Sequence, residues 1–160
     1  MALTYLSLIV PLIFANVIWA SSQERPDLNG NWQLEPSQSA SHSHVPSQLV
    51  WQIEQSDDAV HLIQRFGSNK VGEQRCGTNG KDCKIKDAGH SSIISFYYNG
   101  PVLVELESEG QNRDTVTKKS LSVSKDGSIL TVEVLHLMPA GKAPDKLVFS
   151  RLPTTAQDAH

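Results

Sequence analysis

The chain contains only two cysteines in 160 residues, and its charged side chains form no block of one sign. The formal net charge is −3, with acidic and basic residues interspersed, so the basic surface that binds nucleic acid is not predicted. After the first twenty residues, no apolar run is long enough to span a bilayer as a helix. These absences exclude nucleic-acid binding and a multi-span membrane protein as first interpretations.

Sequence signatures of catalysis are also missing. There is no Gly-x-Ser-x-Gly motif, and no glycine-rich phosphate loop that ends in Lys followed by Ser or Thr. His42 and His44 lie in a polar loop without the further ligands that a metal site needs. Glu105, Glu107 and Glu109 share one strand face, which we interpret as a solvated outer face. We therefore predict no enzyme activity, no metal and no cofactor.

The first twenty residues, MALTYLSLIVPLIFANVIWA, are mostly apolar and uncharged. The run is short for a spanning helix, contains Pro11 and ends at Ala20 before a polar segment, which is typical of a cleaved secretory signal peptide. Because it contains no Lys or Arg, an uncleaved membrane anchor is the open alternative. We expect a signal peptide at 1–20, a lead-in at 21–27, one domain at 28–153 and a flexible tail at 154–160. The mature protein is then periplasmic or extracellular.

The two cysteines of an exported chain are expected to form a disulfide. Asn79-Gly80 is a strong type I′ turn signal between strands at 71–77 and 82–86. A two-residue turn there places Cys76 opposite Cys83, with about 4.5–5.5 Å between their Cα atoms, a distance that a disulfide accepts. A redox or metal-binding pair is the alternative, although the six intervening residues do not match the CxxC spacing.

The clearest element in the sequence is a hairpin over residues 115–138. Asp126-Gly127 lies between two alternating apolar segments and predicts a two-residue turn with positive φ at both positions. That turn pairs Val123 with Leu130 and Leu121 with Val132, which places the apolar side chains on one face.

Similar alternation predicts about ten short strands and no convincing helix. Across the turn at residues 56–58 it pairs Ile53 with Val60 and places Trp51 beside Leu62, and across Asn99-Gly100 it pairs Tyr97 with Val102. Short antiparallel connections join neighbours, so the strands form a meander, which removes its edges best by closing into an up-and-down barrel. A twisted open sheet or a sandwich is the alternative.

The sequence around Gly30-Asn31-Trp32 resembles the first-strand motif of lipocalins. More closely, residues 28–152 resemble a lipocalin-like family of exported bacterial proteins, through NGNWQLEPSQS, WQIEQ, TNGKD, YYNGPVLVELES, LSVSKDGSILTVEV and LVFSRL in this order. The resemblance implies an all-β, calycin-type barrel of about 8–10 strands. It also implies that Trp32 closes the barrel floor and that Arg151 packs on it by a cation–π contact. The chain departs from lipocalins in lacking a second mid-chain motif and a C-terminal helix.

The resemblance implies a carrier whose partner is a small hydrophobic molecule bound in the barrel, and we expect this non-enzymatic protein to be a monomer. The residues expected to line the ligand space are those on the predicted inward faces: Trp51, Leu62, Phe66, Tyr97, Val104, Leu121, Val132 and Val134. The alternative is a structural or protein-interaction module of the cell envelope, whose barrel is filled by its own side chains. The size of the cavity would distinguish the carrier from the filled module. The predicted inward residues are of medium size, so both interpretations stay open.

Overall fold

The computed structural model describes residues 25–42, 47–87, 90–110 and 112–153. The predicted signal peptide and the predicted tail at 154–160 lie outside the described residues, and so does His44. No helix in the described ranges is long and apolar enough to cross a membrane.

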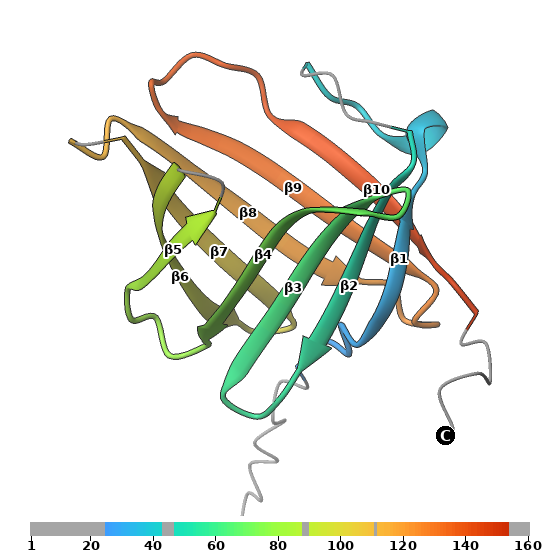
Figure 1. Cartoon of the computed structure of the whole chain (residues 1–160). Helices are drawn as coiled ribbons and strands as arrows, with labels where there is room; N and C mark the ends of the chain where they lie inside the picture. The colour runs from blue at the N-terminus through green and yellow to red at the C-terminus, as the bar shows by residue number, and fades with distance from the viewer. Residues whose placement is uncertain (1–24, 43–46, 88–89, 111, 154–160) are drawn as a thin grey trace, which may run out of the picture.

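The described chain forms one antiparallel sheet of ten strands that curves into a nearly closed barrel (Figure 1). The strands are β1 (Gly30–Leu34), β2 (Leu49–Gln55), β3 (Ala59–Phe66), β4 (Asn69–Gly77), β5 (Cys83–Asp87), β6 (His90–Asn99), β7 (Val102–Glu109), β8 (Thr115–Val123), β9 (Ile129–Met138) and β10 (Asp145–Arg151), with a 3₁₀ turn η1 (Pro36–Gln38) after β1. Their order is β4-β3-β2-β1-β10-β9-β8-β7-β6-β5, because β10 returns to pair with β1. The predicted all-β meander is confirmed.

The two edges of this sheet, β4 and β5, are joined by a disulfide. The Cys76–Cys83 bond is present, as predicted, and its Cα atoms lie 5.8 Å apart, slightly beyond the expected range of about 4.5–5.5 Å. The predicted hairpin between these strands is wrong, because β4 pairs with β3 and β5 pairs with β6. The connecting segment bonds to other elements instead: Thr78 N–H donates to the Asp58 carbonyl, and Gly80 N–H donates to the Phe96 carbonyl. The disulfide therefore bridges the break in the barrel wall.

The register of the β8–β9 hairpin is as predicted, with Leu121 opposite Val132 and Val123 opposite Leu130. The turn itself differs. Gly127 has a φ of 73°, whereas Asp126 is not in the left-handed region, and the turn runs from Ser124, whose carbonyl accepts from Gly127 N–H at 2.9 Å. Asp126 accepts hydrogen bonds from the side chains of Ser124 and Ser128 and from Ser128 N–H, which lower its pKa to about 2. A turn stabilised by a side chain replaced the expected two-residue turn without altering the pairing.

Two other predicted registers are wrong by two residues. Ile53 pairs with Leu62, and Tyr97 pairs with Val104. In both hairpins the turn lies one residue later in the chain than expected: Ser56 N–H bonds to the Ala59 carbonyl, and Asn99 pairs with Val102. A shift of two residues keeps each side chain on its original face, so the alternation survives the error.

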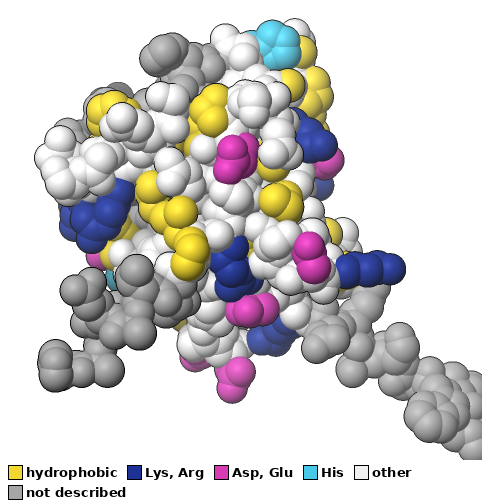
Figure 2. Space-filling view, turned by 90° about the vertical axis from the view of Figure 1, so that its right-hand side faces the viewer, with side chains coloured by type: hydrophobic (Ala, Val, Ile, Leu, Met, Phe, Trp, Pro, Cys, Tyr) yellow, Lys and Arg dark blue, Asp and Glu magenta, His cyan; other side chains and the backbone are white. Residues whose placement is uncertain are grey.

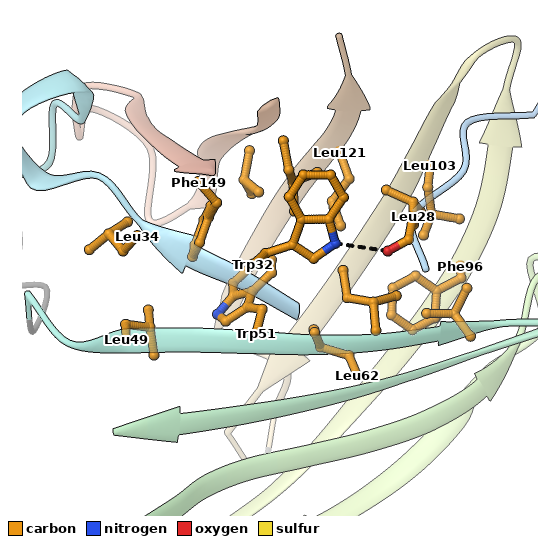
Figure 3. Packing of buried hydrophobic residues seen from close by; sticks show 14 of the residues in the cluster. Leu28, Trp32, Leu34, Leu49, Trp51, Leu62, Phe96, Leu103, Leu121 and Phe149 are labelled. Carbon is orange, nitrogen blue, oxygen red and sulfur yellow. Dashed lines mark hydrogen bonds between the residues drawn. The ribbon is translucent and has the colours of Figure 1, made fainter. Parts of the chain in front are cut away.

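The interior is densely packed at one end of the barrel, which we call the floor; it lies around Leu28, the β8–β9 turn and the end of β10. Figure 3 shows the Trp32 ring between Phe149, Leu121 and Leu28, with its Nε1 donating to the Leu28 carbonyl at 2.8 Å. Trp32, Phe96 and Phe149 are fully buried. We call the opposite end, around η1 and the ends of β7 and β9, the mouth.

Arg151 closes the floor over Trp32, with its guanidinium carbon 4.3 Å from the centre of the ring. The same guanidinium donates to the carbonyls of Gly127 at 2.7 Å and Asp27 at 2.9 Å. The contact that the resemblance implied is therefore present, and it joins the lead-in, β10 and the β8–β9 turn. On the face shown in Figure 2, charged side chains of both signs are interspersed and the hydrophobic ones form small patches.

Candidate functional site

The ladder pairings determine which side chains point into the barrel. From the floor to the middle these are apolar and large, and Trp51 and Phe149 stack with ring centres 4.8 Å apart. Toward the mouth the inward positions become polar on β3, β4, β6, β7 and β8, the positions of Gln64, Gln74, Ser92, Glu105, Glu107 and Lys119. The interior of the barrel is therefore a filled apolar core near the floor and is lined by polar side chains near the mouth.

A pocket of about 280 Å³ lies in this upper half, along the break between β4 and the strands β5 to β7. Its polar lining is Gln64, Glu73, Gln74, Ser92, Glu107 and Glu109, and its apolar lining is Val71, Ile85 and Ile94 together with Gly72. A Cβ at Gly72 would meet only the Gln64 side chain, at 3.6 Å, so the missing side chain leaves this part of the wall thin. The pocket exists because no strand fills the space between the two sheet edges.

Below the pocket, three charged side chains form a buried cluster. Lys119 Nζ donates to Glu105 Oε1 at 2.7 Å and to Glu107 Oε2 at 2.9 Å, and Gln74 Nε2 donates to Glu105 Oε2 at 3.2 Å. Glu105 is fully buried, and the Lys119 side chain is 18% exposed. Burial of the ammonium lowers the pKa of Lys119, but the charges and hydrogen bonds of the two carboxylates outweigh burial and raise it above its ordinary value.

This cluster corrects the interpretation of Glu105 and Glu107 as part of a solvated outer face. Glu105 pairs with Phe96 and Glu107 with Ile94, which are buried, so both glutamates point inward. Glu109 has the same parity but is exposed at the mouth. The available signal was Lys119, which has the same parity as Leu121: an inward lysine requires an inward anion nearby.

The predicted lining residues divide into three groups. Trp51, Leu62, Leu121 and Val132 belong to the buried core, and Val134 is half-buried and packs against it. Phe66 has inward parity but is 41% exposed at the mouth. The prediction that Tyr97 and Val104 point inward is wrong.

Tyr97 and Val104 face each other on the side opposite to Phe96 and Leu103, which belong to the core cluster. The adjacent Tyr98 takes the inward position that was expected for Tyr97. Its hydroxyl accepts from Gln55 Nε2 at 2.8 Å, and burial raises its pKa.

A second polar cluster lies at the mouth around Asp145, which is 6% exposed. Its carboxylate accepts from His42 N–H at 2.6 Å and lies 3.1 Å from His42 Nδ1 and 3.3 Å from His136 Nε2. Burial raises the pKa of Asp145, but these hydrogen bonds outweigh it and lower the pKa overall. Ala40 also pairs with Lys146, so the segment after η1 is held against β10. Within the described ranges, no group of three or more His, Cys, Asp or Glu side chains could hold a metal ion.

One buried donor in the core lacks a partner. Trp51 is 3% exposed, and its Nε1 has no hydrogen-bond acceptor among the described residues. Figure 3 shows this nitrogen on the side of the ring nearer to Leu34 and Leu49, the mouth side. An unpaired buried N–H costs about 1–3 kcal/mol, so the packing here is not fully optimised.

No family model and no curated protein matches the sequence. Solved structures do match in fold. The "REP1-NXSQ fatty acid transporter" superposes with a TM-score of 0.63 at 11% identity, covering 81% of this chain and 98% of that chain. Lipid binding protein 8 of Caenorhabditis elegans gives 0.57 at 8% identity, covering 78% and 94%. The fatty acid binding protein of Schistosoma mansoni, in complex with arachidonic acid, gives 0.55 at 13% identity, covering 78% and 96%. These likenesses show the fold, a calycin-type barrel.

Proposed function

We propose that this chain is an exported, non-enzymatic protein that binds a small hydrophobic molecule in the upper half of its barrel. The observation that carries the proposal is the pocket of about 280 Å³ beside the sheet break, with apolar lining from Val71, Ile85 and Ile94. This volume lies just below the range of about 300 to 1,000 Å³ that is typical of ligand pockets, so the pocket is suited only to a small ligand. The fold neighbours whose titles name fatty acid transport or lipid binding support the same class.

Export is supported by the disulfide, because disulfides persist mainly outside the reducing cytosol. With the signal peptide removed after Ala20, the mature chain begins at Ser21. Its N-terminal sequence, determined on protein purified from an expressing cell, tests this part of the proposal separately.

The second candidate is a structural or interaction module with a filled barrel. The observation that favours it is the dense lower core, where Trp32, Phe96 and Phe149 leave no exposed surface. The two candidates differ in the upper half alone, because a module of this kind needs no ligand in the pocket.

The test is native and denaturing mass spectrometry of the purified protein with organic extraction, followed by displacement of an apolar fluorescent probe. We expect a bound small molecule that is lost on denaturation, and saturable probe binding. A bare mass together with no probe binding would favour the filled module instead.

Two adjacent serines provide a matched pair of variants. Ser92 lines the pocket, whereas Ser91 is exposed on the outer face of the same strand. Ser92→Leu should reduce probe affinity severalfold by filling the pocket, and Ser91→Leu should leave it unchanged. Because overpacking costs about 1–3 kcal/mol, a thermal melt of each variant verifies that it is folded.

A further inference from the structure

The charge of the pocket identifies the chemical class of ligand, given the proposed function. Among the described side chains that line the pocket, none belongs to Lys, Arg or His, whereas three belong to glutamates. Glu73 is neutralised from the outside, since it pairs with Lys70 and with His61 Nε2, which lies at 2.8 Å. Glu107 and Glu109 therefore determine the charge that a ligand meets.

Lys119, an inward cation among the described residues, is already engaged. Lys119 is held between Glu105 and Glu107, so one ammonium is shared by two carboxylates and the cluster keeps one net negative charge. Glu109 makes no ion pair within the described part of the chain and adds a second negative charge at the mouth. A ligand carboxylate would meet like charges and could reach Lys119 only by displacing Glu105 or Glu107, which would leave a buried carboxylate without its cation.

A cationic group on a ligand would instead be attracted to this pocket. It would compensate the excess negative charge and find hydrogen-bond acceptors in the Glu107 and Glu109 carboxylates and in the side-chain carbonyls of Gln64 and Gln74. The apolar side chains of Ile85 and Ile94 would contact the hydrocarbon part. We infer that the pocket binds small amphiphiles with a cationic amine head and discriminates against fatty-acid carboxylates.

The test compares three ligands with the same ten-carbon chain: decylamine, decanol and decanoate. Their affinities for the purified full chain are measured by calorimetry at neutral pH and low salt. We expect decylamine to bind roughly tenfold tighter than decanoate, with decanol between them, because charge interactions in a partly buried site are only weakly screened. The advantage of the amine should shrink only modestly as salt is added, because partly buried charges are screened less than exposed ones.

A variant pair isolates the charge. Glu109→Gln is nearly isosteric, lies at the strand end and leaves the Lys119 cluster intact; it should weaken decylamine binding severalfold and leave decanol binding unchanged. Glu133→Gln, exposed on the outer face of β9, should change neither affinity.

The outcomes separate the two proposals. Decanoate binding as tightly as decylamine, or equal affinities for all three ligands, would overturn the inference about charge and leave the proposed function standing. No binding of any of the three would overturn both.

Discussion

Replacing Lys119 tests whether the charged cluster is buried inside the barrel. Lys119→Met removes the ammonium 2.7 Å from Glu105, a carboxylate with no exposed surface. At an effective dielectric constant of about 20, the attraction lost at this distance is about 6 kcal/mol. Part of this loss is offset, because the Lys119 ammonium no longer has to be transferred from water into the protein. Breaking one partner out of a buried pair costs about 3–5 kcal/mol. We therefore expect Lys119→Met to lower the free energy of unfolding by about 3–5 kcal/mol, measured by urea denaturation.

Two further variants make the result interpretable. Lys118→Met changes the adjacent residue, which lies on the outer face of β8, and should change stability by no more than about 0.5 kcal/mol. The double variant Lys119→Met/Glu105→Leu removes the ammonium and the fully buried carboxylate, and leaves only Glu107, whose side chain is 20% exposed. It should recover most of the loss, because an apolar pair often replaces a buried ion pair at little cost. If Lys119→Met were no more destabilising than Lys118→Met, the inward placement of the glutamates would be refuted.

Two other predictions concern the barrel wall. Reducing the Cys76–Cys83 bond, or replacing both cysteines with serine, should lower the free energy of unfolding by about 2.5 kcal/mol, the chain-entropy contribution of a ring of about eight residues; a midpoint of urea unfolding unchanged by reductant would contradict this. Hydrogen bonds to Glu73 and then Glu54 raise the pKa of His61 above 6.5, so its contribution to stability is present below that value and is lost as the pH rises through the folded pKa. Wild type should therefore lose more stability than His61→Gln between about pH 6 and pH 8, and identical slopes of urea midpoint against pH would show that His61 contributes nothing.

The sequence predicted those parts of the fold that depend on local signals. Asp126-Gly127 sufficed for the β8–β9 register even though the turn has another conformation, because alternation and turn length together constrain the pairing. Cys76 and Cys83 were correctly joined for a partly wrong reason: the chain between them turns, but each strand pairs elsewhere. The disulfide was predictable because the two cysteines are close in the sequence, and not because their strands pair.

The pocket could not be predicted because it depends on a gap. The strands have similar alternating sequences. No residue pattern shows which two consecutive strands are not hydrogen-bonded to each other. β4 is polar on both faces with Gly72 in its middle, which is consistent with an edge strand as well as with an exposed rim. Only the three-dimensional order of the strands shows that the break falls between β4 and β5.

The inward face of β7 follows from the strands that pair with it. Val104 and Leu106 made one face look apolar, so the glutamates were assigned to solvent. Yet Leu121 faces the core, it pairs with Leu103, and Leu103 pairs with Tyr98, which fixes the inward face of β6 and β7 by parity alone. The inward face of β7 therefore depends on the β7–β8 register, and the connection between the two strands has no two-residue turn signal that would predict this register. The inward glutamates could not be predicted without the β7–β8 register. Lys119 nevertheless lies at an inward position, two residues before Leu121, and a buried lysine needs a nearby anion, so this residue already indicated inward carboxylates.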